Sequence, residues 1–368
     1  MHIKAVALSN FRNYKELTYM PSEGKNLICG DNAQGKTNLL EAVHLCAFGR
    51  SQRTVHDEDL IMQGAESAIV KVRVCSEING EHTISISLGE QKHIETDGIR
   101  IKKFADLMGI LKIVMFSPES LSLVKGAPSE RRRFMDMCIS QLSRTYFYRL
   151  QQYTSALRQR NALLKTPDAA KNRDYMRMWD EQLCNAGAYI MASRERFMQS
   201  LVPVVQDMHE LLSSGRDKLD IAYLPSIHGH GKDIKAAFAE KLTQSLDDDI
   251  RRGMTGAGTH KDDIMLKING SDARSFASQG QQRTAALALR LSEVQFIRRV
   301  SEESPVVLLD DVFSELDESR CRALLRCMDD CQCIFTSALS PGFEGEKMSV
   351  TRCVKGELFP ESTAAQQQ

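Results

Sequence analysis

The segment that most limits what this chain can fold into is the octapeptide from Gly30 to Thr37, which reads G-D-N-A-Q-G-K-T. It follows the short apolar run 27–29 and precedes a helical pattern that begins at residue 38. Strand, glycine loop and helix in this order are the context that a phosphate-binding loop requires. Glycines in the loop let the backbone close round a phosphate, and the N–H groups at the start of the helix point at the anion. The sequence therefore predicts a site for a nucleoside triphosphate.

Two side chains of this loop have specific expected tasks. Lys36 should reach the β- and γ-phosphates, and the Thr37 hydroxyl should take one ligand position of Mg²⁺. We therefore expect the cofactors to be a nucleoside triphosphate and Mg²⁺. The residues expected to surround the nucleotide are Gly30, Asp31, Asn32, Ala33, Gln34, Gly35, Lys36, Thr37 and Asn38.

The composition places the chain among ordinary globular proteins. Its 368 residues, 42% of them hydrophobic, can form two or three domains, and no apolar run is long enough to cross a membrane. The first residues read as a strand and lack the apolar core and cleavage site of a secretory signal. Ten cysteines without regular spacing favour free thiols in a reducing compartment. We expect a cytoplasmic protein, associated with the nucleoid if it binds DNA.

The character of the chain changes twice along its length. Strand patterns surround the phosphate loop, and apolar residues then recur at helical spacing over 129–165 and over 174–213. Two long helices joined by a short break indicate an antiparallel helical arm. The remaining third alternates strands and helices before a polar end. The expected parts are a head over 1–120, an arm over 121–253, a second piece of the head over 254–361 and a disordered tail over 362–368.

Charge is unevenly distributed, although the 48 basic and 48 acidic residues of the whole chain cancel. Between Lys125 and Arg196 there are 14 Lys and Arg and 7 Asp and Glu, which is a local excess of +7. A basic segment within a neutral protein is a candidate surface for nucleic acid. Long solvated helices also carry charge for no further reason, so this feature alone leaves both interpretations open.

A second part of the nucleotide site is expected in the last third of the chain. Residues 306–309 are apolar and lead directly into Asp310 and Asp311, which is the pattern of a buried strand that ends in carboxylates. Ligand sites of parallel sheets lie beyond such strand ends. We expect Asp310 to hold Mg²⁺ and Asp311 to orient or deprotonate the attacking water.

The segment between these two motifs narrows the class of protein. Residues 277–282 read A-S-Q-G-Q-Q and open a helix rich in Ala, Leu and Arg. Ser278 can cap that helix, and Gly280 allows close approach to an anion. Placed after a phosphate loop and before an acidic strand and the sequence S-E-L-D at 314–317, this segment resembles the L-S-G-G-Q signature of ABC-type ATPases. The first Gly of that signature is replaced here by Gln279.

Several further runs resemble the RecF family, the bacterial recombination-mediator ATPases within the ABC/SMC-like class. These runs are L-S-N-F-R-N-Y at 8–14, F-S-P-E at 116–119 with L-V-K-G at 123–126, R-R-R-F-M-D at 131–136 and H-K-D-D at 260–263. The resemblance covers nearly the whole chain. It implies an α/β fold, namely an ABC-type ATPase head with mixed sheets and flanking helices, and an inserted α-helical arm domain.

The resemblance also implies how the protein works. ATP would lie between two heads of a homodimer, with the signature of one protomer on the γ-phosphate of the other. The residues implied in catalysis are Asp311, Lys36 and Ser278, and those added to the nucleotide contacts are Arg12, Gln279, Gly280, Gln281 and Asp317. The implied partners are double-stranded DNA with its single-strand junctions, and RecR with RecO in the loading of RecA. The implied activity is a weak, DNA-stimulated ATPase used in recombinational repair, replication-fork restart and SOS induction.

Some positions depart from the pattern of ABC-type ATPases. Glu commonly follows the metal-binding Asp, whereas Asp311 is one methylene shorter, and a base held further from the water should make hydrolysis slow. The histidine expected after the next strand is missing, which leaves Thr336 and Ser337 to contact phosphate. No glutamine stands near Phe116 where the class commonly has one, and Thr259 stands where this family has Pro.

Four arginines are candidates for contact with DNA. Arg53 lies just after the first helix, where an arginine in related heads links DNA to the nucleotide, although an ordinary loop arginine is an equal alternative. Arg131, Arg132 and Arg133 are expected to contact phosphates or the body of the head, since nothing nearby looks like a recognition helix.

The alternative functions are an ABC-type ATPase subunit of another DNA-maintenance complex or of a transport complex, and a structural SMC-like head. The long basic arm argues against a transporter subunit, and the helices are too short for a long coiled coil. A kinase with a phosphate-binding loop is excluded mainly by the signature.

Overall fold

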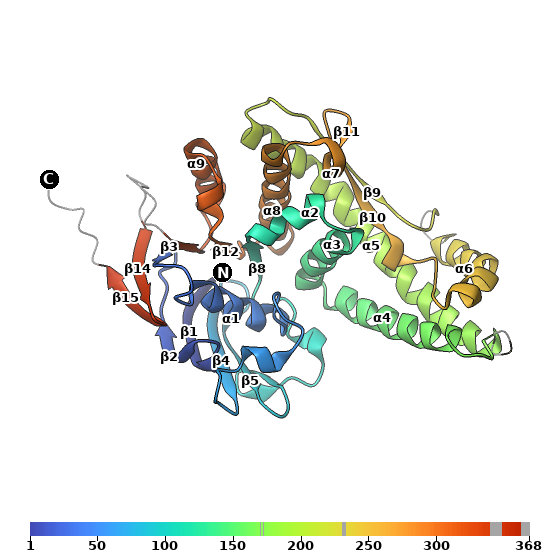
Figure 1. Ribbon diagram of the computed structural model, residues 1–368, viewed down its shortest axis with the longest axis horizontal. Coiled ribbons are helices and arrows are strands. Elements are labelled where there is room, and N and C mark those ends of the chain that lie inside the picture. The colour runs from blue at the N-terminus through green and yellow to red at the C-terminus, as the bar shows by residue number, and fades with distance from the viewer. Residues whose placement is uncertain (170, 172, 230–232, 339–347, 362–368) are drawn as a thin grey trace. The chain divides into compact units, whose positions relative to one another are not determined.

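The computed structural model describes residues 1–169, 171, 173–229, 233–338 and 348–361 (Figure 1). The chain divides into two compact units, one formed by residues 1–120 with 289–368 and the other by residues 121–288. The tail expected to be disordered, 362–368, lies outside the described residues. Within the described part of the chain, no helix combines the length and the apolar character needed to span a membrane.

The first unit contains an antiparallel sheet of six strands in the order β2-β1-β4-β5-β6-β7. Alternate residues of β4 are buried, which is the pattern of a sheet that covers a core with one face. Ile3 and Val6 of β1 and Val72 of β4 are fully buried in this core. The strands are β1 (His2–Phe11), β2 (Tyr14–Tyr19), β4 (Ala68–Ser76), β5 (Gly80–Leu88), β6 (His93–Thr96) and β7 (Ile99–Arg100).

The second sheet of this unit is largely parallel, in the order β15-β14-β3-β13-β12-β8. Every residue of β12 and of β13 is buried, in agreement with the apolar runs 306–309 and 333–335 that begin these strands. Its strands are β3 (Lys25–Cys29), β8 (Ile113–Phe116), β12 (Val306–Asp310), β13 (Cys333–Ser337), β14 (Met348–Val354) and the antiparallel edge strand β15 (Glu357–Glu361).

The helices of the first unit connect these strands. They are α1 (Lys36–Phe48), α9 (Glu318–Arg326), most of the shared helix α8 (Gln279–Ser301), and the 3₁₀ turns η1 (Asp57–Leu60), η2 (Phe104–Asp106), η3 (Pro118–Leu121) and η5 (Val312–Glu315). Because β3, β13, β12 and β8 run parallel, their carboxyl ends lie along one edge of the sheet. That edge therefore gathers the phosphate loop, the two aspartates and Thr336.

The second unit is mainly helical, with a small antiparallel sheet in the order β11-β10-β9. The helical pattern expected over 129–165 forms two helices rather than one, because Ser143 interrupts it and caps the second helix by accepting a hydrogen bond from the backbone N–H of Tyr146. Its helices are α2 (Ser122–Lys125), α3 (Pro128–Leu142), α4 (Arg144–Leu164), α5 (Arg173–Ser213), α6 (Asp233–Arg252), α7 (Ala273–Phe276) and the 3₁₀ turn η4 (Thr259–Lys261), and its strands are β9 (Leu219–Leu224), β10 (Asp263–Ile268) and β11 (Ser271–Asp272).

The two units meet in sequence at positions 120/121 and 288/289. The first position is where the sequence analysis placed the start of the arm, whereas the second lies beyond the expected 253/254. The physical reason is strand pairing: β10 pairs over its whole length with β9, which precedes residue 253. The segment from 254 to 288 is therefore part of the same compact unit as the helical arm.

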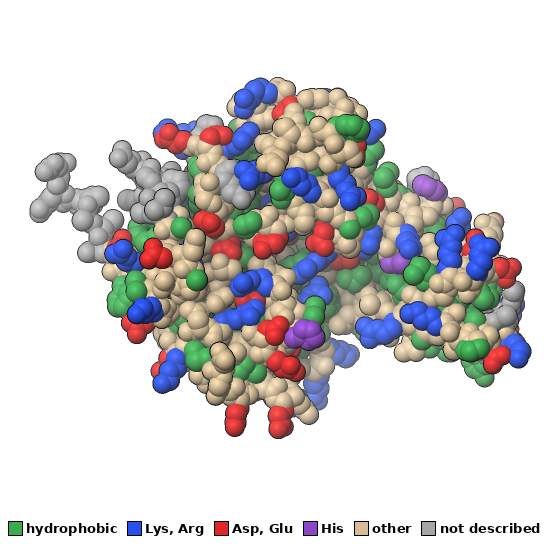
Figure 2. Space-filling model, viewed as in Figure 1, with side chains coloured by type: hydrophobic (Ala, Val, Ile, Leu, Met, Phe, Trp, Pro, Cys, Tyr) green, Lys and Arg blue, Asp and Glu red, His purple; other side chains and the backbone are tan. Residues whose placement is uncertain are grey.

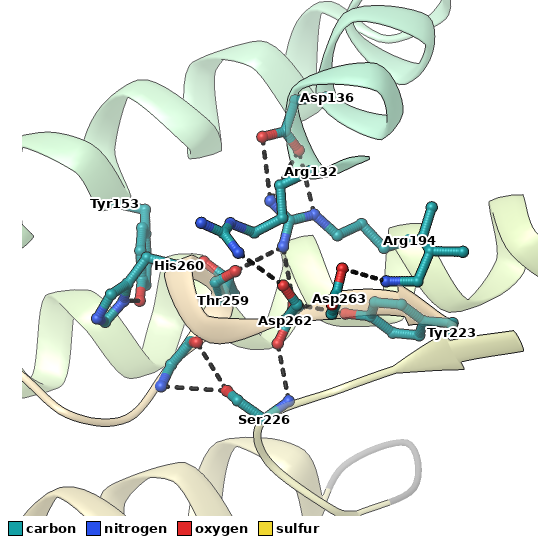
Figure 3. Close-up of polar contacts among 12 residues, drawn as sticks. Arg132, Asp136, Tyr153, Arg194, Tyr223, Ser226, Thr259, His260, Asp262 and Asp263 are labelled. Atoms are coloured by element: carbon teal, nitrogen blue, oxygen red, sulfur yellow. Dashed lines mark hydrogen bonds and ion pairs between the residues drawn. The ribbon is translucent and has the colours of Figure 1, made fainter. Parts of the chain in front are cut away.

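A buried polar network holds the second unit together (Figure 3). The Arg194 guanidinium is 2% exposed and donates to both carboxylate oxygens of Asp136, to Asp262 Oδ2 at 2.7 Å and to the carbonyl oxygen of Thr259. Asp262 also accepts from the Tyr223 hydroxyl. A buried charge is stable when it is paired and hydrogen-bonded in this way. The network joins α3, α5, β9 and the turn before β10.

Buried ion pairs of this kind reduce the positive charge that the basic segment 125–196 can present at the surface. Arg131, Arg160 and Arg194 are buried, and they pair with carboxylates that include Asp249 and Asp262 from much later in the chain. Part of the local excess of +7 is thus neutralised inside the unit and does not reach its surface. Exposed Lys and Arg side chains remain over α4 and α6 on the face seen in Figure 2.

Candidate nucleotide site and signature motif

The phosphate loop has the backbone that its two glycines allow. Gly30 and Gly35 have φ of +151° and +112°, which is a region that disfavours side chains. A Cβ at Gly35 would lie 2.5 Å from the Asn13 amide, and one at Gly30 would lie 2.3 Å from the carbonyl oxygen of Cys353. The loop therefore requires glycine at both positions.

Helix α1 begins at Lys36, directly after the second glycine of this loop. Gly35 is its N-cap residue and provides no side-chain cap, and the first turn carries no acidic side chain. The positive end of the helix dipole is thus not neutralised locally, which is the condition for binding an anion there. Lys36 is 7% exposed, and its ammonium donates to the carbonyl oxygens of Gly30 and Asp31, at 2.5 and 2.7 Å, so it lies against the loop.

Neighbouring segments hold the back of the loop, and the sequence analysis did not identify them. The Tyr14 hydroxyl donates to the carbonyl oxygen of Gly35, and the Asn13 amide donates to that of Gln34. The backbone N–H of Lys355, in the turn between β14 and β15, donates to Gln34 Oε1. These bonds fix the loop before any ligand is bound, and such preorganisation lowers the cost of binding.

Thr37 and Asp310, both predicted to hold the metal, lie in direct contact. The Thr37 hydroxyl donates to Asp310 Oδ1 at 2.9 Å, and the Thr336 hydroxyl donates to the same oxygen at 2.7 Å. Burial raises the pKa of Asp310, whereas the hydrogen bonds from these two hydroxyls oppose the rise. A carboxylate beside a hydroxyl is an oxygen donor set that suits Mg²⁺. The residues present therefore fit this ion.

Asp311 has an unusual environment. Its φ is +49°, in the left-handed region, and its backbone N–H donates to the carbonyl and hydroxyl oxygens of Thr336. Its Oδ1 is buried and has no hydrogen-bond partner among the residues that the structure describes. A buried carboxylate oxygen without a partner is rare, and a backbone held in this region stores strain. Both features are common at functional sites.

Thr336 has a different position from the one expected. The sequence analysis assigned it to phosphate contact in place of a histidine. In the structure its side chain is 1% exposed, and its hydroxyl bonds to Asp310 and accepts from the Asp311 N–H. It therefore organises the two carboxylates. Ser337 follows it at the end of β13 and is 6% exposed.

Glu119 is a second group that the sequence analysis did not select. It follows β8, whose carboxyl end lies beside that of β12. Its charge is close enough to raise the pKa of Asp310 further. A carboxylate thus stands near the place where the sequence analysis looked for a glutamine.

A buried carboxylate on α1 connects Arg12 with Arg53. Glu41 is fully buried and accepts two hydrogen bonds from the Arg12 guanidinium, at 2.8 and 3.0 Å, and one from the Ser51 hydroxyl. It also accepts from Arg53 at 3.3 Å, and Arg53 donates to Asn38 Oδ1 at 2.9 Å. Glu41 therefore joins Arg12, an expected nucleotide contact, to Arg53, an expected DNA contact. The sequence did not single out Glu41.

The three arginines at 131–133 lie in different environments. Arg131 is 6% exposed and bonds to both carboxylate oxygens of Asp263, so its guanidinium is committed within the unit. Arg132 donates to the carbonyl oxygen of Asp262 at 2.8 Å. Arg133 is half-buried on the same helix, α3. The sequence indicated that this triplet contacts phosphates or the body of the head, but the partners of Arg131 and Arg132 lie in the second unit.

The signature motif lies in the second unit, at the start of α8. Ser278 Oγ accepts from the backbone N–H of Gln281, and Gln281 Oε1 accepts from the backbone N–H of Ser278 at 2.9 Å. This reciprocal arrangement is a capping box. Apart from its chain neighbours and the nearby backbone of its own helix, no described atom lies within 4 Å of the place of a Cβ at Gly280, and Gln279 is exposed. The motif therefore presents an open surface.

Asp317, the remaining predicted nucleotide contact, begins a helix of the first unit. Its side chain accepts from the backbone N–H of Arg320 at 3.0 Å and so caps α9.

A phosphate loop and an acidic strand on a largely parallel sheet, with an inserted, mainly helical unit that carries a serine-glycine-glutamine signature, define an ABC-type ATPase head of the SMC-like class. The family model described as RecF/RecN/SMC N terminal domain matches residues 2–352. An SMC head domain from Pyrococcus furiosus, at 16% identity, shares the fold with a TM-score of 0.58.

More similar relatives narrow this class. The DNA replication and repair protein RecF of Lachnoclostridium phytofermentans is 40% identical over 358 residues, which cover 96% of this chain and 98% of that protein. The protein of the same name from Lachnospira eligens is 39% identical and covers 96% and 97%. A solved structure of the recombination mediator protein RecF with ATP, in the RecFOR pathway, matches with a TM-score of 0.91 at 35% identity over 98% of both chains. The chain belongs to the RecF family.

Proposed function

We propose that this protein is an ATP-dependent recombination mediator that binds DNA as a homodimer. The observation that carries the proposal lies at one edge of the parallel sheet, in a chain of the RecF family: Thr37 contacts Asp310, and Asp311 beside them has an Oδ1 without a partner among the described residues. The relative solved with ATP in the RecFOR pathway supports both the nucleotide and the pathway.

In this proposal the first unit binds ATP with Mg²⁺. Lys36 moves its ammonium from the loop carbonyls to the β- and γ-phosphates, and the backbone N–H groups at the start of α1 bind the remaining phosphate oxygens. Thr37 and Asp310 would hold Mg²⁺, which would supply positive charge against the phosphates. Thr336 keeps Asp310 in place through its hydrogen bond.

Asp311 is the group proposed to orient the attacking water. Its buried Oδ1 is an acceptor without a described partner, so it can take a hydrogen bond from water without breaking another one. The carboxylate is short and its backbone is fixed by two bonds to Thr336, so it cannot readily move closer to the phosphate. Slow hydrolysis is the expected result, which suits ATP as a switch.

The signature motif is proposed to complete the site of a second protomer. Ser278 and the open backbone at Gly280 are the groups that would contact the γ-phosphate bound to the partner's head. A contact made to ATP and not to ADP gives the dimer a higher affinity for ATP. Gln279, Gln281 and Asp317 would lie at the same interface.

DNA is proposed to bind through phosphates, without sequence preference. Arg53 and Arg133 remain candidates, and the exposed Arg144 and Arg158 of α4 are added to them by the structure. Arg144 and Arg158 lie about four helical turns apart, so they point to nearly the same side of the helix. Such contacts release counterions, and the affinity should therefore fall steeply with salt.

The biological role follows from these parts. The bound dimer would mark the junction of duplex and single strand at a gap, and would recruit RecR with RecO so that RecA replaces the single-strand binding protein. Hydrolysis, stimulated by DNA, would dissolve the dimer. This role includes replication-fork restart and the SOS response, in the cytoplasm at the nucleoid.

The test is a binding assay on gapped and plain duplexes at several salt concentrations, with ATP, ADP or no nucleotide. The proposal expects tight binding with ATP alone, a steep loss with salt and little dependence on sequence. Equal DNA affinity with ATP, with ADP and without nucleotide would contradict the ATP switch. A strong preference for one DNA sequence would contradict binding through phosphates.

A further inference from the structure

The segment 214–218, which links α5 to β9, lies against the signature motif within the second unit. Helix α5 ends at Ser213, and Gly215 then donates its backbone N–H to the carbonyl oxygen of Glu210 at 2.9 Å. Ser214 and Gly215 have φ of +56° and +71°. This left-handed turn stops the long helix of the arm and directs the chain to Asp217.

Asp217 receives hydrogen bonds from two distant segments. Its Oδ1 accepts from the Gln281 amide at 2.8 Å and from the Asn269 amide at 2.9 Å. Asn269 begins the turn between β10 and β11, and its own Oδ1 accepts from the backbone N–H of Lys218 at 2.9 Å. Burial opposes ionisation here, but the hydrogen bonds from Gln281 and Asn269 hold the pKa of Asp217 below its ordinary value. The carboxylate is therefore charged when it meets the two amides.

The bond from Asp217 decides how the signature glutamine is oriented. Gln281 Nε2 faces the carboxylate, so its Oε1 is left to accept from the backbone N–H of Ser278 at 2.9 Å. A flipped amide would place two oxygens against each other at Asp217 and two N–H groups against each other at Ser278. Asp217 thus selects the amide orientation that completes the capping box.

We propose that Asp217 is a positioning residue for the signature motif, and that through it the end of α5 sets the geometry of Ser278. The proposal rests on the proposed function, in which Ser278 contacts the γ-phosphate of the partner protomer. Without the bond, Gln281 gains other rotamers, and Ser278 loses the partner of its N–H for part of the time. A small misplacement at a phosphate contact is costly because the contact depends on geometry.

The experiment compares Asp217→Ala with Asp217→Asn and with Asp220→Ala in the full chain. Asn at this position keeps an oxygen that can accept from the Gln281 and Asn269 amides, so Asp217→Asn should preserve the orientation of Gln281. Asp220 is a matched control: it lies on the neighbouring strand β9, and its half-exposed carboxylate pairs at 3.7 Å with the exposed Lys218 ammonium. The readouts are hydrogen exchange at Ser278 and Gln281 without nucleotide, the binding of ATP to the single head, and the ATP-dependent dimerisation constant.

Asp217→Ala should speed exchange at Ser278 and weaken ATP-dependent dimerisation by about tenfold, the usual effect of losing one hydrogen bond to a charged group. ATP binding to the single head should stay within about twofold of the parent, because the phosphate loop belongs to the other unit. Asp217→Asn and Asp220→Ala should resemble the parent in all three readouts. In a Gln281→Ala background, Asp217→Ala should cause little further change in exchange at Ser278 or in dimerisation, since the two side chains act as one pair.

The proposal would be overturned if Asp217→Ala left the exchange rate at Ser278 unchanged. It would also be overturned if Asp217→Ala weakened dimerisation equally in the parent and in the Gln281→Ala background. Faster exchange with unchanged dimerisation, in a parent that dimerises with ATP, would overturn it as well. A parent that does not dimerise with ATP would contradict the proposed function instead, and the exchange rates would still decide whether Asp217 orders the signature.

Discussion

Replacing Asp262 by Ala should destabilise the second unit far more than the same change at its neighbour Asp263. The Asp262 side chain is fully buried, and it accepts from the Arg194 guanidinium at 2.7 Å, from the Tyr223 hydroxyl at 2.6 Å and from the backbone N–H of Ser226 at 2.8 Å. Removing it leaves all three donors in the interior without that acceptor. Loss of one partner of a buried charge pair costs about 3–5 kcal/mol.

The neighbouring pair provides the control. Asp263 binds the Arg131 guanidinium through both oxygens, but 27% of its side chain is exposed. Water can replace part of what Asp263→Ala removes, so we expect a cost of about 1–2 kcal/mol. Both variants keep the same chain length and the same change of charge, and burial is the main difference between them.

Urea unfolding followed by tryptophan fluorescence measures this difference. Trp179 is the single tryptophan of the chain and lies on α5, so it reports the unit that contains the network. With an m-value of about 2 kcal/mol/M, the Asp262→Ala midpoint should fall by about 1.5–2.5 M urea and the Asp263→Ala midpoint by less than about 1 M. Equal shifts, or a shift below about 0.5 M for Asp262→Ala, would refute the argument that the buried network stabilises this unit.

Other predictions concern the nucleotide site and the dimer. Asp311→Asn should bind ATP like the parent but hydrolyse it at least about tenfold more slowly, and hydrolysis at the parent rate would reject it as the water-orienting group. Ser278→Arg should bind ATP and remain a monomer by sedimentation, because a bulky cation then occupies the proposed interface. Thr336→Val should lower kcat with little change in ATP affinity, since it removes the bonds that hold the two aspartates; an affinity loss without a kcat loss would contradict this. Glu41→Gln should weaken ATP binding by about tenfold in calorimetry, because it removes the charge that holds two arginines, whereas the exposed control Glu16→Gln should not.

Much of the fold follows from local patterns in the chain. The glycine spacing at 30–37 and the apolar run at 306–309 each dictate a local conformation, and the structure has a loop and a buried strand there. Helical spacing over 174–213 predicted a single helix, and α5 covers Arg173–Ser213. Such features depend on neighbours in sequence, which is why a sequence alone can predict them.

The partners of charged side chains were decided by the tertiary structure. The sequence left open whether the arginine triplet contacts phosphates or the protein, and Arg131 is buried because Asp263, far along the chain, folds against it. No motif in the sequence includes Glu41, and its two arginines come from segments before and after α1. The second boundary of the inserted unit likewise depends on the pairing of β9 with β10. Identity and spacing determine what a residue can do, whereas burial and charge pairing depend on contacts between segments that are distant in sequence.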